Sequence, residues 1–159
     1  MDVSIIIVNY NTRDLTLQCL RSVYEKTKNL EFEMIVVDNA SSDDSVESIK
    51  KQFPQVRVVE SSENLGFGRA NNLGLGIATG RNILFLNSDT ELVNNAILIL
   101  SEYLDAYTDV AVCGGNLYSK EMHPVHSFFR LFPSIFSPQF NQITNCTLFF
   151  FIDNNFIIS

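Results

Sequence analysis

Residues 83–91 read Ile-Leu-Phe-Leu-Asn-Ser-Asp-Thr-Glu, an apolar run that ends abruptly in amide, hydroxyl and acidic side chains. Gly80 and Arg81 precede the run, and a helical pattern follows it. The run therefore predicts a buried parallel strand whose carboxyl end opens into a polar loop. Open α/β sheets bind their ligands at that end of their strands. Asp89 is consequently a candidate for holding a hard divalent cation next to a phosphorylated ligand.

The same polar residues have a plainer interpretation. Asn, Ser and Asp favour tight turns and the position that caps the start of a helix. Residues 87–89 could therefore be only a turn and the N-cap of the helix that follows. This stretch alone leaves both interpretations open.

The chain repeats the alternation of apolar strand and amphipathic helix. It predicts an α/β fold with an open, mostly parallel sheet, flanked by helices and connected by right-handed crossovers. Glycines inside one of the helices each cost up to about 1 kcal/mol relative to alanine, which predicts that a backbone or a ligand approaches that helix closely. The expected strands are 3–8, 32–37, 56–59, 83–86 and 110–113, and the expected helices are 13–26, 45–52, 67–78 and 94–107.

Composition narrows the function classes. A length of 159 residues leaves room for one domain with its own core rather than two. A net charge of −7 argues against a nucleic-acid partner and gives no attraction to anionic membranes. Phosphates would therefore have to be held by backbone amides or by a metal rather than by a basic surface.

Cysteine usage and the N-terminus favour a cytosolic protein. The three cysteines, Cys19, Cys113 and Cys146, have no metal-ligand spacing and are expected to be reduced thiols. Residues 1–8 lack a basic region and a cleavage site, so they are expected to form a first strand rather than a signal peptide. We therefore expect a cytoplasmic location, with association at the inner face of the membrane as a further expectation.

The alternation weakens after Gly115. Nine of the thirteen phenylalanines lie between Phe128 and Phe156, a region with hardly any charge. We therefore divide the chain into an α/β domain at residues 1–118 and an aromatic-rich segment at residues 119–159 that is not an independent domain. The segment is expected to cover a core or form an interface, and its apolar surface predicts a homo-oligomer. A peripheral membrane anchor is the alternative, although the usual neighbouring lysines and arginines are missing.

Polar side chains follow three of the expected strands, at residues 9–11, at Asp38 and at residues 87–89. A ring for stacking, an acid for a base or ribose, and an acid for a metal together suit a nucleoside diphosphate. Two other nucleotide-binding folds do not fit. A dinucleotide-binding domain needs its glycine-rich turn directly after the first strand, and a phosphate-loop NTPase needs a GxxxxGK[ST] sequence.

Four motifs closely resemble the family-two glycosyltransferases of GT-A fold. They are VSIIIVNYN at 3–11, IVVDNASSD at 35–43, NLGFGRANNLG at 64–74 and LNSDTE at 86–91. The likeness covers about residues 3–118 and is strongest to the bacterial rhamnosyltransferase-like branch. It implies a GT-A-type, Rossmann-like sheet in an inverting enzyme. Such an enzyme transfers a sugar from a nucleoside-diphosphate sugar to a saccharide or lipid-linked acceptor in cell-surface polysaccharide synthesis.

The resemblance also assigns roles by position. Val8 and Tyr10 would form the base pocket, and Asp38 would bond to the base or the ribose. Residues 87–89 match the family's DxD motif in an NxD form, so Asp89 would bind Mn²⁺ or Mg²⁺ beside the donor. The implied donor-binding residues are Val8, Tyr10, Asn11, Asp38, Asn64, Gly66, Asn71, Asn87 and Asp89.

Members of this family usually continue well past position 159, through acceptor-side strands and an acidic motif that contains the catalytic base. No stretch after Leu117 matches that motif. The resemblance therefore implies a donor-binding half that is truncated on the acceptor side and lacks the catalytic base. A non-catalytic module that binds nucleotide sugars or serves in assembly is the alternative.

Overall fold

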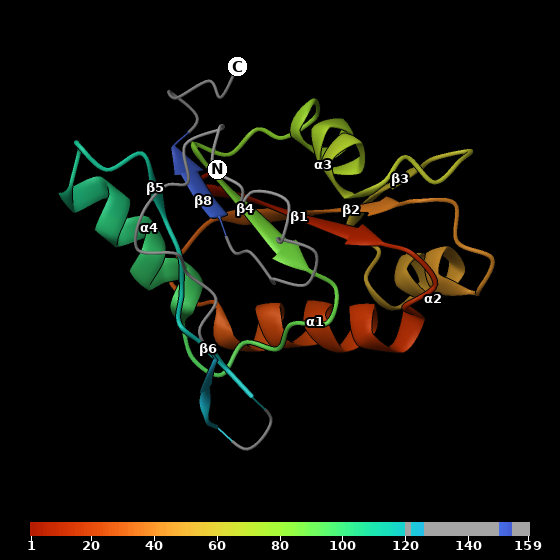
Figure 1. Ribbon diagram of the computed structural model, residues 1–159, viewed down its shortest axis with the longest axis horizontal. Helices are drawn as coiled ribbons and strands as arrows, with labels where there is room; N and C mark the ends of the chain where they lie inside the picture. Colours follow the sequence, from red (N-terminus) through yellow and green to blue (C-terminus); the bar gives the residue numbers. More distant parts are fainter. Residues whose placement is uncertain (120–121, 126–149, 154–159) are drawn as a thin grey trace, which may run out of the picture.

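The computed structural model describes residues 1–119, 122–125 and 150–153. Within these residues the strands of one sheet lie in the order β3-β2-β1-β4-β8-β5, and β6 pairs with β7 in a separate hairpin (Figure 1). The elements are β1 Val3–Asn9, α1 Arg13–Lys26, β2 Phe32–Asp38, α2 Ser45–Gln52, β3 Arg57–Glu60, α3 Phe67–Leu75, β4 Asn82–Asn87, α4 Ala96–Ala106, β5 Val112–Cys113, β6 Leu117–Tyr118, β7 Pro124–Val125 and β8 Phe150–Asp153.

The predicted open, mostly parallel sheet is confirmed. β1 pairs in parallel with β2 and β4, and β2 pairs in parallel with β3. β8 runs antiparallel between β4 and β5. We did not predict β8, because the aromatic run that contains it has neither the strand nor the helix period. The division of the chain at residue 118 stays a prediction, and most of the segment after it lies outside the described residues.

Helices cover both faces of the sheet. α1, α2 and α4 lie on one face, and α3 lies on the other (Figure 1). Alternate residues of β1 serve the two faces: Ile5 and Ile7 pack in the cluster with α1, whereas Ile6 packs in the cluster with α3. These three side chains are fully buried. Burial of one such side chain contributes about 1.5–3 kcal/mol, which explains the uninterrupted apolar runs of the strands.

Gly74 explains why α3 contains glycine. A Cβ at this position would lie 2.6 Å from Ile6 Cγ2 and 3.2 Å from Val37 Cγ2. At Gly74 the close approach that we predicted is therefore present, and side chains of the sheet make it, whereas a Cβ at Gly68 would meet nothing within 4 Å. Gly66, at the start of α3, has a φ of 75°, which few residues other than glycine adopt. α3 ends at Leu75, three residues before the predicted end.

A polar network joins the amino-terminal ends of the strands on the α3 face. The Glu33 side chain is 12% exposed, and its Oε1 accepts hydrogen bonds of 2.7 Å from the Ser4 and Thr79 hydroxyls. Arg57 Nη1 donates to Oε2 at 3.0 Å, and the Gly80 backbone N–H donates to Ser4 Oγ at 2.7 Å. Burial raises the pKa of Glu33, but the hydrogen bonds outweigh burial and lower this pKa to about 2. The carboxylate thus fixes the turn that leads into β4.

Acid will weaken the fold through Glu33. Since its folded pKa of about 2 lies below the ordinary value of 4.5, the carboxylate stabilises the fold fully above pH 4.5 and loses that contribution as the pH falls toward 2. Glu33→Gln should lower the free energy of unfolding by about 2 kcal/mol at pH 7. Urea unfolding at several pH values should show this difference shrinking below pH 4.5. The control is Glu63→Gln, at an exposed glutamate. The prediction would be contradicted if the loss of unfolding free energy in Glu33→Gln were the same at every pH.

Two further sequence expectations concern the cysteines and membrane-spanning segments. Cys19 and Cys113 are free thiols, as expected, and Cys146 lies outside the described residues. None of the helices in the described ranges has the length and apolar content of a membrane span.

Candidate functional site

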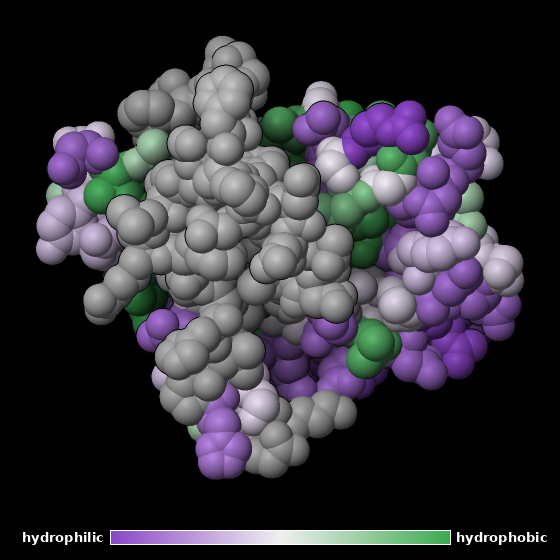
Figure 2. Space-filling view, in the orientation of Figure 1, coloured by the Kyte–Doolittle hydropathy of each residue, from purple (hydrophilic) through white to green (hydrophobic). Residues whose placement is uncertain are grey.

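The carboxyl ends of three parallel strands meet at one edge of the sheet. Asn9 of β1 lies opposite Asp38 of β2, and Val8 of β1 lies opposite Asn87 of β4. The predicted meeting of these strand ends is therefore confirmed. The edge is at the right of Figure 1, and the surface there is mostly hydrophilic (Figure 2).

The strand register divides the predicted residues between the two faces of the sheet. Residues that lie opposite one another in parallel strands project to the same face. Asn9 and Asp38 project toward α1, where Asn9 meets Thr16. Val8 and Asn87 belong to the face that α3 covers, where Val8 packs in the same cluster as Ala70. A ligand above this edge would therefore meet one set of side chains from each face.

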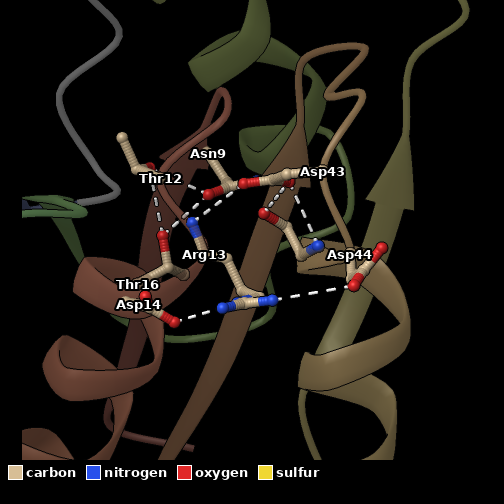
Figure 3. A network of polar contacts seen from close by, with 8 residues as sticks. Asn9, Thr12, Arg13, Asp14, Thr16, Asp43 and Asp44 are labelled. Atoms are coloured by element: carbon tan, nitrogen blue, oxygen red, sulfur yellow. Dashed lines mark hydrogen bonds and ion pairs between the residues drawn. The ribbon is translucent and has the colours of Figure 1, made fainter.

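Asn9 is the centre of a polar network that the sequence did not identify. It is 0% exposed, and its Nδ2 donates to Asp38 Oδ1 at 2.7 Å and to Ser41 Oγ at 3.0 Å. Its Oδ1 accepts from the hydroxyls of Thr12 at 2.9 Å and Thr16 at 2.7 Å (Figure 3). All donors and acceptors of the amide are therefore used by the protein. The only sign of this network in the sequence was the position of Asn9, an amide at the end of an apolar strand.

Asp38 is held by the same network. It is 3% exposed, and its Oδ2 accepts a hydrogen bond of 3.0 Å from the Ser41 backbone. With the bond from Asn9 to Oδ1, each oxygen has one partner and keeps a lone pair. The predicted contact with a base or ribose would use such a lone pair, and it stays a prediction.

The loop after β1 is fastened to the loop after β2. Asn11, which has a φ of 54°, accepts a hydrogen bond of 2.8 Å from the Ser42 backbone through Oδ1. Asp43 accepts a bond of 3.1 Å from the Arg13 backbone (Figure 3). Tyr10 directly precedes the anchored Asn11 in sequence and is 48% exposed. Its ring is therefore accessible, as a ring that stacks on a base must be.

Asn64 and Gly66 are joined to the same edge by Asn39, a second residue that the sequence did not identify. Asn39 is buried, and its Nδ2 donates to Asn64 Oδ1 at 2.8 Å. The same Asn64 oxygen accepts a bond of 2.9 Å from the Gly66 backbone. The start of α3 is thus fixed to the end of β2. Asn71 is also buried and donates to the Phe67 carbonyl at 3.0 Å, one turn into α3.

The loop after β4 carries two groups that have no hydrogen-bond partner among the residues the structure describes. Asn87 Oδ1 is buried, and no described residue donates a hydrogen bond to it. Asp89 is exposed, and within the described ranges its carboxylate forms no hydrogen bond or ion pair. Thr90 N–H donates to the Asn87 carbonyl at 3.2 Å, so residues 87–90 do form a turn. Their interpretation as a helix N-cap is wrong, because α4 is capped by Asn95 and starts after it.

The donor set fits a cation that is shared with a phosphorylated ligand. Among the residues that the structure places, no group of three or more His, Cys, Asp or Glu side chains is arranged to hold a metal. Mg²⁺ beside phosphates usually takes only one or two carboxylates from the protein and the remainder from phosphate and water. The exposed carboxylate of Asp89, which forms no ion pair with any residue placed by the structure, is suited to that role. The assignment of the metal to Asp89 stays a prediction.

A hollow of about 410 Å³ lies along the outer face of α1. None of the predicted donor-binding residues lines it, so it is not the site that the strand ends form. Its lining consists of Asp14, Leu17, Gln18, Arg21, Ser22, Glu25, Gln52 and Glu91.

Comparison with known proteins gives consistent matches. The family model described as "Glycosyl transferase family 2" matches residues 4–159. The poly(ribitol-phosphate) beta-glucosyltransferase of Bacillus spizizenii is 38% identical over 103 residues, which cover 62% of this chain and 16% of that protein.

Two solved structures resemble this fold. S. aureus TarS 1-349 in complex with UDP-GlcNAc aligns with a TM-score of 0.60 and 25% identity, over 68% of this chain and 32% of that chain. The mannosyltransferase PcManGT from Pyrobaculum calidifontis, in complex with GDP-Man and Mn²⁺, aligns with a TM-score of 0.62 and 26% identity, over 69% of this chain and 34% of that chain. The chain spans only 16% to 39% of the length of the first curated relatives it matches.

Proposed function

This chain belongs to glycosyl transferase family 2, and we propose that it forms the donor-binding part of an enzyme that transfers a sugar from a nucleoside-diphosphate sugar. The family and the GT-A-type fold expected from the sequence are confirmed. The observation that carries the proposal is a pair of oxygen groups after β4 for which the described part of the chain provides no hydrogen-bond partner. Asn87 Oδ1 and the Asp89 carboxylate lie at the edge where the ends of β1, β2 and β4 meet.

The proposed donor binds across this edge. Tyr10 would stack on the base and Val8 would line its pocket, while Asp38 would accept a hydrogen bond from the base or ribose. Asn11 and the segment from Asn64 to Asn72 would enclose the nucleotide sugar. The two solved relatives support this proposal, because their complexes contain UDP-GlcNAc in one case and GDP-Man with Mn²⁺ in the other.

The charges of the edge favour a metal at Asp89. The Arg13 guanidinium already bonds to Asp14 at 2.9 Å and lies 3.6 Å from Asp44. The hydrogen bond to Asp14 and that acid's charge raise the pKa of Arg13. This cation is thus engaged by acids and is poorly placed to neutralise a diphosphate. A divalent cation, when bound, would stabilise the negative charge that the leaving diphosphate gains during transfer.

The finer features of the reaction are also proposals. We propose an inverting transfer to a saccharide or lipid-linked acceptor in cell-surface polysaccharide synthesis, in the rhamnosyltransferase-like branch. The name of the Bacillus spizizenii relative, a poly(ribitol-phosphate) glucosyltransferase, supports a cell-surface polymer as the acceptor class. We further propose a cytoplasmic location at the inner face of the membrane and a homo-oligomer through the apolar C-terminal segment.

Calorimetric titration tests the donor proposal. The 159-residue chain is titrated with UDP, dTDP and GDP, each with Mn²⁺ and with EDTA. We expect one of the three to bind, and to bind more tightly with Mn²⁺ than with EDTA. Absence of binding by all three would overturn the proposal.

A transfer assay addresses the prediction that these residues lack the catalytic base. The chain is incubated with a labelled nucleotide sugar and a polysaccharide acceptor, and product formation is measured. Binding without transfer is expected. Robust transfer would show that the base lies within these 159 residues.

A further inference from the structure

One side of α1 and its N-cap hold the loop that carries Asp89. In Figure 1 the loop that leaves β4 runs beside α1 before it reaches α4. Four side chains from residues 12–22 make hydrogen bonds to it. The first bond joins the hydroxyl oxygens of Thr12 and Ser88 at 3.2 Å, and Ser88 can donate it because the Thr12 proton goes to Asn9. The others are Cys19 Sγ to the Asn87 carbonyl at 3.6 Å, Gln18 Nε2 to Glu91 Oε2 at 2.9 Å, and Leu92 N–H to Ser22 Oγ at 3.0 Å.

Ser22 is the buried anchor among these contacts. It is 5% exposed, and its hydroxyl donates to the Cys19 carbonyl at 2.8 Å while it accepts from the Leu92 N–H. Both bonds fix the orientation of the hydroxyl. Leu92 is itself buried, and the described hydrogen bond of its N–H is the one to the serine hydroxyl.

Cys19 lies directly beneath the turn. It is fully buried, and burial together with the negative charge of Asp89 raises the pKa of its thiol to about 12. The thiol is therefore protonated at neutral pH and serves as a donor to the Asn87 carbonyl. Asp89 is thus close enough to α1 for its charge to act on the helix.

The two ends of the turn are consequently fixed while its centre is exposed. Asn87 is held at one end by Cys19, and Leu92 is held at the other end by Ser22. Asp89, between them, has no partner of its own among the described residues. Its position is therefore set by the anchors on α1 rather than by contacts of its carboxylate.

We propose that Ser22, assisted by Cys19, is a positioning residue for Asp89. By fixing the loop at residues 87–92, it holds the carboxylate where a metal bound to a nucleoside diphosphate would meet it. Because the loop is already fixed, less conformational entropy is lost when the metal and the nucleotide bind. The inference rests on the proposed donor site, because it presupposes that Asp89 binds the metal.

Ser22→Ala tests the inference by metal-dependent binding rather than by turnover. The nucleotide used is whichever of UDP, dTDP and GDP binds the wild type most tightly. With Mn²⁺ present, we expect its Kd to rise about tenfold in the variant, as is common when a group that orients a metal ligand is lost. With EDTA the Kd should stay unchanged. Hydrogen exchange at the Leu92 amide, which donates to Ser22, should become faster in the same variant.

Ser101→Ala is the matched control. Ser101 is another buried helical serine, and its hydroxyl accepts one hydrogen bond, from Asn82, away from the loop. This variant should keep the wild-type Kd with Mn²⁺. If Ser22→Ala does not fold, the exposed Gln18→Ala variant decides, with an expected rise of about threefold from one lost hydrogen bond.

The outcomes separate the two proposals. If the wild type binds no nucleotide with Mn²⁺, the donor site itself is refuted. A different outcome is that the wild type binds a nucleotide with Mn²⁺ while Ser22→Ala, or its substitute Gln18→Ala, has the same Kd as Ser101→Ala. In that case the positioning role is refuted and the donor site stands.

Discussion

Replacing Asp89 with alanine will raise the Kd for the preferred nucleoside diphosphate in Mn²⁺ by about 100-fold. Loss of groups that merely orient metal ligands costs 10–100-fold in metal affinity, so loss of the ligand itself should reach at least the upper value. In free energy this is about 2.7 kcal/mol. The effect should vanish in EDTA, because an exposed carboxylate contributes to binding only through the metal. Calorimetric titration of wild type and variant, with and without Mn²⁺, measures both quantities.

Asp109→Ala provides the control for loss of one exposed negative charge. Asp109 is exposed like Asp89 but lies in the turn after α4. It should leave the Kd with Mn²⁺ within about twofold of the wild type, since a distant exposed charge acts weakly through water and salt. An equal effect of both variants would mean that net charge, not a metal ligand, is responsible. The Asp89→Ala variant should also unfold at the same urea concentration as the wild type. The Asp89 carboxylate bonds to none of the described residues, so its removal breaks no described contact.

The parallel part of the fold was predictable because its signals are local. The apolar runs at residues 3–8 and 83–86 are long enough to identify strands, and each ends in polar residues that mark the carboxyl edge. Their pairing follows from the rules for α/β sheets rather than from the residues themselves. β8 could not be predicted in this way. Its place between β4 and β5 depends on pairing with residues 65 to 71 positions away in β4 and 38 to 40 positions away in β5, for which the local pattern carries no signal.

The candidate site was predictable only where its residues are exposed or follow a motif. Tyr10 and Asp89 were identified, and both are exposed at the expected edge. Asn9 and Asn39 lie within the quoted motifs but were assigned no role, because a buried amide that organises its neighbours looks in sequence like any turn-forming asparagine. Their roles depend on partners about 25 to 30 residues away, which become neighbours only when β1, β2 and α3 have assembled.

Asn9→Ala will lower the free energy of unfolding by about 4 kcal/mol. The amide makes four hydrogen bonds, each contributing about 1 kcal/mol, and its loss also leaves Asp38 Oδ1 buried without its donor. This is a large part of the 5–15 kcal/mol that is typical of a domain. Urea unfolding measures the change. Asn82→Ala, at a buried asparagine with one side-chain hydrogen bond to Ser101, should cost only about 1–2 kcal/mol.

Asn9→Asp distinguishes loss of hydrogen bonds from disturbance of the Asp38 carboxylate. The change keeps an acceptor for Thr12 and Thr16 but places a second carboxyl group 2.7 Å from Asp38 Oδ1. Two carboxylates at this separation cannot both stay ionised, so one pKa rises above its unfolded value. At pH 8 the free energy of unfolding should therefore be lower for Asn9→Asp than for Asn9→Ala. As the pH falls to 5, a proton shared by the two carboxyl groups restores the hydrogen bond, so the stability of Asn9→Asp should rise relative to that of Asn9→Ala. A stability difference between the two variants that does not change with pH would mean that the introduced carboxyl group shares no proton with Asp38. The four bonds of Asn9 would then act only on the loops around it.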